Sequence, residues 1–325
     1  MGLPTRTETL DDLYTTTINN RSKEIVDNIF KAIPFYNYLK SKGSITFDGT
    51  GGRYLEIPLS YGKNDTVTSL SKGDTISISD TAFLTTAQYL WKFVAGTVVR
   101  YYVDDAKNKS KEAIFKLVDA KVENLKRSLS DKFEEFFFGD GTGNSSKDPE
   151  GLGNLVSTSP TSSLEVGNIN QSTYTWWANQ QKGATGAASV YLLTDMRTLF
   201  NNCSKGQAMD APDFIVTDQT SHEYYDDEVI EQKQIVNNTA TGDPMFTSVQ
   251  FKGIPVMWSS QCTSGYMYFL NSKYITLVTD PDINFTMTEW KSIPNQLDRV
   301  AQMVCKFNLV TSRRASLGVL TGVTA

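Results

Sequence analysis

The apolar residues of positions 105–137 recur every three or four residues, which predicts one long amphipathic helix. No Gly or Pro interrupts the pattern, and at 1.5 Å per residue such a helix would be ~50 Å long. The apolar stripe consists of Ile114, Val118, Val122, Leu125, Leu129, Phe133 and Phe136. The opposite face has balanced charges, which predicts a solvated side with ion pairs one turn apart: Lys116, Asp119, Glu123, Lys126, Arg127 and Glu134. The glycine-rich run 139–143 predicts the helix end and a turn.

Residues 44–95 alternate between apolar and polar in two arms, which predicts an extended two-stranded ribbon. The alternating residues are Leu55, Ile57 and Leu59 in the first arm and Ala87, Tyr89, Trp91, Phe93 and Ala95 in the second. The intervening residues 61–80 are polar, with one brief alternation at Ile76 and Ile78. A two-stranded ribbon is marginally stable alone in water, so its aromatic residues need another surface. An adjacent copy of the chain is the simplest one.

Residues 10–30 form a loosely amphipathic pattern that predicts an N-terminal helical arm ending before Pro34. Acidic residues interrupt this segment throughout, which is not typical of a secretory signal. No stretch of the chain approaches eighteen consecutive apolar residues, so we expect no membrane span and no membrane partner.

The second half of the chain shows short alternating elements, which predict a compact α/β lobe and, for the whole chain, an α+β fold. The expected strands are 189–193, 214–217, 249–258, 266–270, 274–278 and 299–312, and the expected helices are 194–202 and 219–232. We expect the last strand to return and pack against the long helix.

Candidate chemistry is sparse. His222 is the only histidine, and Cys203, Cys262 and Cys305 lie far apart without disulfide or metal spacing, so we interpret the cysteines as buried, reduced thiols. The glycine run follows a helix rather than a strand, which fits neither a dinucleotide site nor a P-loop. We therefore expect no catalytic residues, cofactor or metal. A hydrolase that pairs Cys203 or Ser221 with His222 is the enzyme alternative.

Charge argues against a dedicated nucleic-acid binder, because the net charge of the 325 residues is -5. Residues 210–231 contain eight acidic residues and no Lys or Arg, Asp226 and Asp227 among them. One interpretation is a solvated helix face. The other is a docking surface for a basic patch around Arg299, Arg313 and Arg314 on a neighbouring copy.

The order of arm, ribbon, long helix, glycine turn and α/β lobe resembles that of the major capsid proteins of tailed bacteriophages, the Hong Kong 97 type fold. Four local strings are similar to that family: Pro34-Phe35 with Leu39; Asp148-Pro149-Glu150-Gly151-Leu152; Tyr174-Thr175-Trp176-Trp177; and Phe251-Lys252-Gly253-Ile254-Pro255-Val256 before Tyr268-Phe269-Leu270-Asn271. The resemblance covers nearly the whole chain.

The resemblance implies a division of the chain into five parts. They are an N-terminal arm at 1–43, an E-loop ribbon at 44–95, a peripheral domain with the spine helix at 96–150, an axial domain at 151–290 and C-terminal strands at 291–325 that return to the peripheral domain.

It also implies that copies self-assemble into the hexamers and pentamers of an icosahedral head, which encloses double-stranded DNA without sequence-specific binding. The protein would be located in the virion and assembled in the host cytoplasm. Partners would be the chain itself, a portal and a separate scaffolding protein, since Met1 stands just before the arm; decoration proteins are left open. An encapsulin-like compartment shell has the same fold and is the alternative.

From the ribbon and the charge pattern we select candidate intersubunit contacts. They are Leu55, Ile57, Tyr89, Trp91, Phe93, Asp226, Asp227, Arg313 and Arg314. Some relatives crosslink their subunits through a lysine in the E-loop. Lys63 and Lys72 lie in the ribbon, but no acceptor asparagine and helper acid can be identified, so we expect no crosslink.

Overall fold

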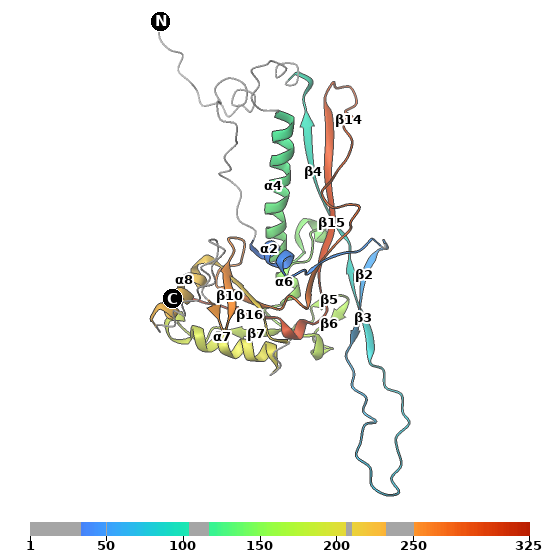
Figure 1. Cartoon of the computed structure of the whole chain (residues 1–325), viewed down its shortest axis with the longest axis vertical. Coiled ribbons are helices and arrows are strands. Elements are labelled where there is room, and N and C mark those ends of the chain that lie inside the picture. The colour runs from blue at the N-terminus through green and yellow to red at the C-terminus, as the bar shows by residue number, and fades with distance from the viewer. Residues whose placement is uncertain (1–33, 50, 104–116, 206–209, 232–249) are drawn as a thin grey trace. The chain divides into compact units, whose positions relative to one another are not determined.

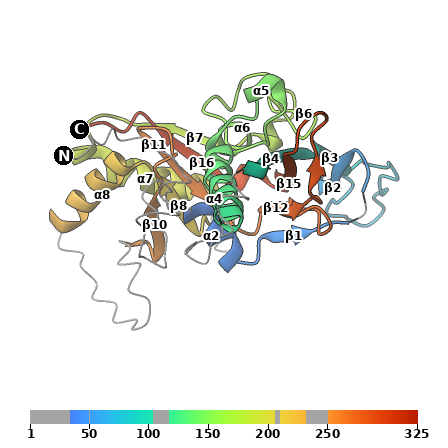
Figure 2. The same ribbon diagram turned by 90° about the horizontal axis from the view of Figure 1, so that it is seen from above.

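The computed structural model describes residues 34–49, 51–103, 117–205, 210–231 and 250–325 (Figures 1 and 2). These residues divide into two compact units. The larger unit holds the described residues of 33–93, 134–281 and 306–325, and the smaller unit those of 94–133 and 282–305. The predicted N-terminal helix and the first part of the predicted long helix, residues 105–116, lie outside the described residues.

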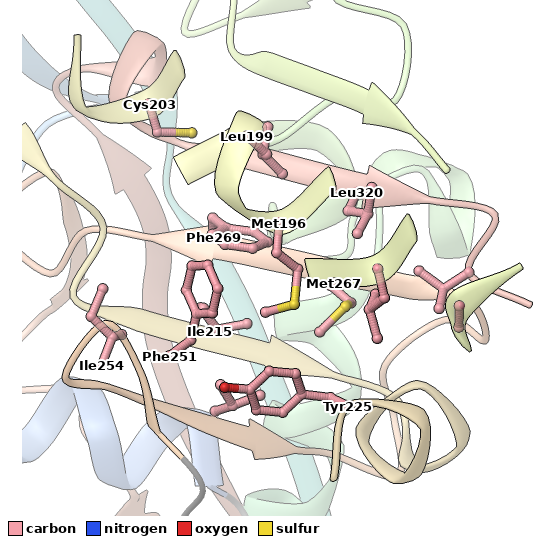
Figure 3. Packing of buried hydrophobic residues seen from close by; sticks show 14 residues of the cluster. Met196, Leu199, Cys203, Ile215, Tyr225, Phe251, Ile254, Met267, Phe269 and Leu320 are labelled. Atoms are coloured by element: carbon pink, nitrogen blue, oxygen red, sulfur yellow. The ribbon is translucent and has the colours of Figure 1, made fainter. Parts of the chain in front are cut away.

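A six-stranded mixed sheet is the centre of the larger unit, with the order β7-β16-β11-β8-β10-β9. Its strands are β7 (Gln180–Gly183), β8 (Phe214–Thr217), β9 (Gln250–Phe251), β10 (Ile254–Trp258), β11 (Tyr266–Leu270) and β16 (Gly318–Thr321). Helices α7 (Ala188–Ser204) and α8 (Gln219–Glu231) pack on this sheet. Figure 3 shows Met196 and Leu199 of α7 close to Ile215 and Phe269 of the sheet, and all four residues are at 0% exposure. This cluster is the hydrophobic core of the unit.

Strand β15 (Arg299–Thr311) is the central strand of the second six-stranded sheet, where it pairs with four other strands. In the larger unit β1 (Ile45–Phe47) pairs in parallel with β12 (Ile275–Thr279), which pairs antiparallel with the end of β15. In the smaller unit β13 (Thr286–Met287) and β14 (Lys291–Ser292) pair antiparallel with β15, which also pairs with β4 (Lys92–Arg100). The remaining short elements are α5 (Gly143–Ser146), α6 (Leu152–Leu155), β5 (Glu165–Val166), β6 (Ile169–Asn170), η1 (Thr175–Trp177) and η3 (Arg314–Ser316).

The long helix is confirmed as α4 (Leu117–Phe138), whose 22 residues correspond to ~33 Å. In the smaller unit, Leu129 and Phe133 of its stripe are buried as predicted, and the ring of Phe133 lies 5.3 Å from that of Phe285, whereas Val118, Val122 and Leu125 are half-buried. On the solvated side Arg127 forms the expected ion pair with Glu123, at 3.3 Å. In the larger unit the ring of Phe137 lies 6.4 Å from that of Phe307 on β15, so the predicted packing of the last strand against the long helix is confirmed.

The prediction that Glu134 belongs to the solvated face of this helix is wrong. Glu134 is 1% exposed, and its Oε1 accepts hydrogen bonds from Phe35 N (3.3 Å) and Ser259 Oγ (3.1 Å). Helix α2 (Pro34–Ser41) begins against this last turn of α4, and a carboxylate there binds the amide end of α2. Helical periodicity places Glu134 opposite the apolar stripe, but it does not show that a distant segment covers that side.

Two further elements differ from the sequence-based expectations. Residues 189–193 are not a strand but the first part of α7, where Val190 and Tyr191 are exposed while Leu192 is buried. An apolar run of four residues, 190–193, fits both periods, and the burial of every third or fourth residue on to Cys203 decides for the helix. The predicted strand 249–258 is the hairpin β9–β10, whose two-residue turn has positive φ at Lys252 (52°) and Gly253 (80°).

The other elements of the α/β lobe form where they were expected. Strands β8, β11, β12 and β15 and helix α8 lie within one or two residues of the predicted bounds. The glycine run ends α4 as predicted: Gly139 N donates to Glu135 O (3.1 Å), and Asp140 Oδ1 then accepts from Thr142 N (3.0 Å). The hydrogen bonds from Thr142 lower the pKa of Asp140.

Gly151 packs directly against this turn, and we expect Gly151→Ala to destabilise the protein. A Cβ at this position would lie 2.2 Å from Phe136 O and 2.5 Å from Gly139 O. Both neighbours are backbone atoms that cannot rotate away, so overpacking should cost about 3 kcal/mol. Urea unfolding should show the loss, whereas Gly183→Ala should change little because only Gln181 Nε2 lies near, at 3.9 Å. Equal midpoints for the two variants would contradict this expectation.

Candidate intersubunit surface

The predicted ribbon exists as the antiparallel pair β2 (Tyr54–Ser60) and β3 (Leu84–Leu90) in the larger unit. In its register Leu55 lies opposite Tyr89 and Ile57 opposite Ala87, so the alternating residues share one face as predicted. That face is held by its own chain: Tyr89 Oη donates to Thr311 O (3.1 Å), and Asn308 Nδ2 donates to Leu90 O (2.8 Å). The base of the ribbon is therefore fixed on the subunit.

The expectation that the ribbon has no partner within its own chain is wrong for three of the candidate residues. Leu55, Tyr89 and Trp91 are 5%, 1% and 8% exposed, respectively. The indole of Trp91 lies 4.3 Å from Lys306 Nζ, which in turn pairs with Asp280 at 2.6 Å. Alternation shows which side chains share a face, but not which surface covers that face.

Ile57 and Phe93 differ from these three residues. Ile57 is only half-buried on the ribbon, and Phe93 is 60% exposed. Phe93 does not belong to the ribbon, however, because strand β3 ends at Leu90 and Phe93 lies on the next strand, β4. Contact of these two side chains with another copy stays a prediction.

The exposed apolar surface of the ribbon lies instead at its far end, residues 61–83, which we call the ribbon tip. Figure 1 shows it as an open loop beyond β2 and β3. Its apolar side chains are more than half exposed: Val67, Leu70, Ile76, Ile78 and Phe83, with Ile78 at 98%. At the start of the tip Tyr61 stacks on Trp176, with ring centroids 5.4 Å apart. Our candidate contacts omitted these residues, although the alternation of Ile76 and Ile78 in a polar stretch was a visible signal.

The acidic residues of 210–231 do not form one patch. Asp210 is 3% exposed, pairs with Arg313 of the same chain at 2.6 Å and accepts a hydrogen bond from Tyr274. The bond from Tyr274 and the charge of Arg313 lower the pKa of Asp210. Asp218 is also buried and accepts from Gly265 N at 3.0 Å. For Asp210 and Arg313, the acid-base pairing expected between copies thus occurs within one chain.

Asp226 and Asp227 both lie on helix α8, and only Asp227 fits the first interpretation of the acidic stretch, a solvated helix face. Asp227 is exposed, and Asp226 is half-buried and lies 3.2 Å from His222 Nδ1. Contact of Asp226 and Asp227 with another copy stays a prediction.

Arg314 is not part of a basic surface patch, so that expectation is wrong. It is 0% exposed, and its guanidinium donates to Leu155 O (2.8 Å), Gln171 Oε1 (3.0 Å) and Asn179 Oδ1 (3.1 Å). Burial lowers the pKa of Arg314 to about 10. The five donors of a guanidinium suit such a hub of carbonyl acceptors, which joins η3 to the segment 155–179.

The cysteines are buried free thiols, as predicted. Burial raises the pKa of Cys203, Cys262 and Cys305, to about 11 for Cys305, which disfavours the thiolate. No group of three or more His, Cys, Asp or Glu residues suited to a metal occurs in the described part of the chain. Among these described residues, no helix combines the length and the apolar character that a membrane span requires.

The ring of His222 contacts a carboxylate and a backbone carbonyl rather than a nucleophilic side chain. Its ring nitrogens lie 3.2 Å from Asp226 Oδ2 and 3.3 Å from Val256 O, and neither Ser221 nor Cys203 is among its hydrogen-bond partners within the described residues. We expect His222→Ala to cost about 1 kcal/mol of stability, for one or two lost hydrogen bonds, and to leave assembly unchanged. Loss of a hydrolytic activity that the parent protein shows would instead support the enzyme alternative.

No protein-family model matches this chain, and no curated protein matches it either. Solved structures do. The capsid subunit of cyanophage A-1(L) is similar with a TM-score of 0.70 and 13% identity, over 95% of this chain and 97% of that chain. The capsid of the myovirus XM1 is similar with a TM-score of 0.61 and 12% identity, over 94% and 97%. The chain has the Hong Kong 97 capsid fold. The mixed helix and sheet class and the resemblance proposed from the sequence are both confirmed at the level of the fold.

The Hong Kong 97 capsid fold also occurs outside phage heads. The SrpI encapsulin of Synechococcus elongatus is similar to this chain with a TM-score of 0.57 and 11% identity, over 91% of this chain and 92% of that chain. The same fold thus occurs in phage capsids and in an encapsulin, and the role of this chain has to be argued separately.

Proposed function

We propose that this chain is the major capsid protein of a tailed bacteriophage, a structural subunit that self-assembles into the hexamers and pentamers of an icosahedral head around double-stranded DNA. The observation that carries the proposal is the likeness to the cyanophage capsid subunit over 95% of this chain and 97% of that one. Neither chain has a large unmatched region, which supports a subunit of the same extent.

The parts can be assigned to roles in a shell. We assign residues 44–95 to the E-loop, 96–150 to the peripheral domain with α4 as spine helix and 151–290 to the axial domain. Of residues 291–325, β15 returns to α4 as expected, whereas β16 does not, because it pairs with β7 and β11 in the sheet of the α/β lobe. Residues 1–43 would be the N-terminal arm. The exposed ribbon tip supports this assignment, since apolar side chains in an open loop are stabilised when another copy covers them.

The proposed partners follow from the same role. The chain would bind itself, a portal and a separate scaffolding protein, and it would enclose DNA without reading its sequence, in accord with a net charge of -5. Its place would be the virion, after assembly in the host cytoplasm.

An encapsulin-like compartment is the second candidate, and the likeness to the SrpI encapsulin favours it. Gene neighbourhood separates the two: terminase and portal genes beside this gene support a phage head, whereas a peroxidase or a ferritin-like protein supports a compartment.

Negative-stain microscopy of the purified protein tests the shared claim of self-assembly. Closed shells, tubes or capsomer rings are the expected result, because heterologous contacts repeat until geometry closes them. A protein that stays monomeric at high concentration, with crowding agents and across salt concentrations, would contradict the proposal. Boiled assembled particles should yield intact monomers, since no crosslink is expected.

A further inference from the structure

Glu150 occupies an unusual place at the base of the ribbon. It lies in the loop between α5 and α6, and its backbone N donates to Asn308 Oδ1 (3.0 Å). The amide of the same Asn308, at 0% exposure, donates to Leu90 O at the end of β3. One side chain of β15 thus joins the loop that carries Glu150 to the ribbon.

The surroundings of the Glu150 carboxyl leave a negative charge on it incompletely compensated. Its Oε2 is buried and has no hydrogen-bond partner among the described residues. The nearest cations have other acceptors: Lys92 Nζ donates to Ser146 O (2.7 Å), and Arg314 donates to its hub of carbonyl acceptors. A buried carboxylate oxygen without a donor costs far more than a neutral carboxyl in the same place.

The charged and titratable groups around this carboxyl come from several elements. They are Tyr89 on β3, Lys92 on β4 and Arg314 on η3, with the amide of Asn154 on α6. Burial is the largest influence and raises the pKa of Glu150 to about 7, while the charge of Lys92, a hydrogen bond from the Asn154 side chain and the charge of Arg314 act in the opposite direction. The carboxyl therefore changes its charge in the neutral pH range.

We propose that Glu150 is a pH-sensitive latch at the base of the ribbon. Its neutral form keeps β3 fastened through Asn308, and its ionised form loosens this contact. When the carboxyl loses its proton, the uncompensated charge is relieved by water entering the base of the ribbon or by Lys92 turning from Ser146 O toward the carboxylate. Either movement disturbs the segment from Tyr89 to Lys92 and weakens the attachment of the ribbon to its own subunit.

The direction of the pH effect follows from the raised pKa. The folded value near 7 exceeds the ordinary value of 4.5. The stabilising contribution of the neutral carboxyl is thus complete below about pH 4.5 and is lost as the pH rises through 7. Acid should fasten the ribbon and mild alkali should release it.

Hydrogen exchange of the ribbon in the full-length protein tests the latch. After correction for intrinsic exchange, opening of β2 and β3 should increase on the order of tenfold between pH 5.5 and 8. In Glu150→Gln, which keeps the shape and cannot ionise, this increase should disappear. Glu165→Gln is the matched control, because Glu165 is exposed on β5 and should keep the parental pH profile.

A second variant covers the case in which Glu150→Gln does not fold. Because Lys92 favours the ionised carboxyl, Lys92→Gln should move the midpoint of the pH transition upward, which a merely structural loss would not do. A flat profile in the parent, an unchanged slope in Glu150→Gln or an unmoved midpoint in Lys92→Gln would each overturn the latch. None of these readings depends on assembly, so the latch and the proposed capsid role can fail separately.

Discussion

Replacing Ile76 and Ile78 together by aspartate is expected to abolish shell formation and to leave the subunit folded. The two side chains are 63% and 98% exposed, so the isolated subunit gains little from them. Covered by another copy, each apolar side chain contributes roughly 2 kcal/mol before the costs of association. Two carboxylates in the same contact would add desolvation costs, and the shell repeats the contact at every subunit.

The matched control for this variant is the substitution of Ser77 and Ser79 by aspartate. It adds the same charge to the same exposed segment, but on the alternate side of an extended chain. Negative-stain microscopy and sedimentation should show shells for the control and free subunits for the isoleucine variant, with equal thermal unfolding of the two subunits. Parental yields of shells from the isoleucine variant would show that the ribbon tip is not a contact.

Replacing the buried Arg314 by methionine is expected to destabilise the folded subunit more than any other substitution proposed for this chain. Methionine fills part of the space but leaves Leu155 O and Gln171 Oε1 without the guanidinium donor, while Asn179 Oδ1 keeps its hydrogen bond from Ser157 N (3.0 Å). Buried acceptors that lose a charged donor cost 1–3 kcal/mol each as a general order, so a total of about 4 kcal/mol is expected after partial relaxation.

Urea unfolding with linear extrapolation measures this loss. Arg314→Lys should recover little, because one ammonium cannot reach acceptors that the planar guanidinium reaches in three directions. Arg299→Met removes the same charge from an exposed position and should stay within about 0.5 kcal/mol of the parent. If Arg314→Met unfolds like Arg299→Met, the hub contributes no more than a surface residue.

Arg314, Asp210 and Arg313 show what charge composition cannot predict about intersubunit contacts. Charge composition indicated that an acidic stretch and a basic cluster attract each other, and Asp210 and Arg313 do pair. Composition could not distinguish pairing within one chain from pairing between copies, because both satisfy the same Coulomb attraction. For Arg314 even the surface location was wrong, since its partners are carbonyl and amide oxygens that carry no charge signal.

The sequence by itself determined the elements whose signal is local and long. The period of α4 and the alternation of the ribbon and of β15 repeat over many residues, so each pattern excludes the other geometries. The order of these elements was also sufficient to suggest the capsid fold, which the solved structures confirm.

The tertiary structure alone decided which surfaces these elements cover. It placed Tyr89 and Leu55 on their own subunit, enclosed Glu134 beneath α2 and left Ile76 and Ile78 as the exposed apolar residues of the ribbon tip. It also decided that residues 189–193 continue a helix. The physical reason is the same in each case: burial depends on contacts between segments far apart in the chain, and a periodic pattern records only the side on which such a contact is made.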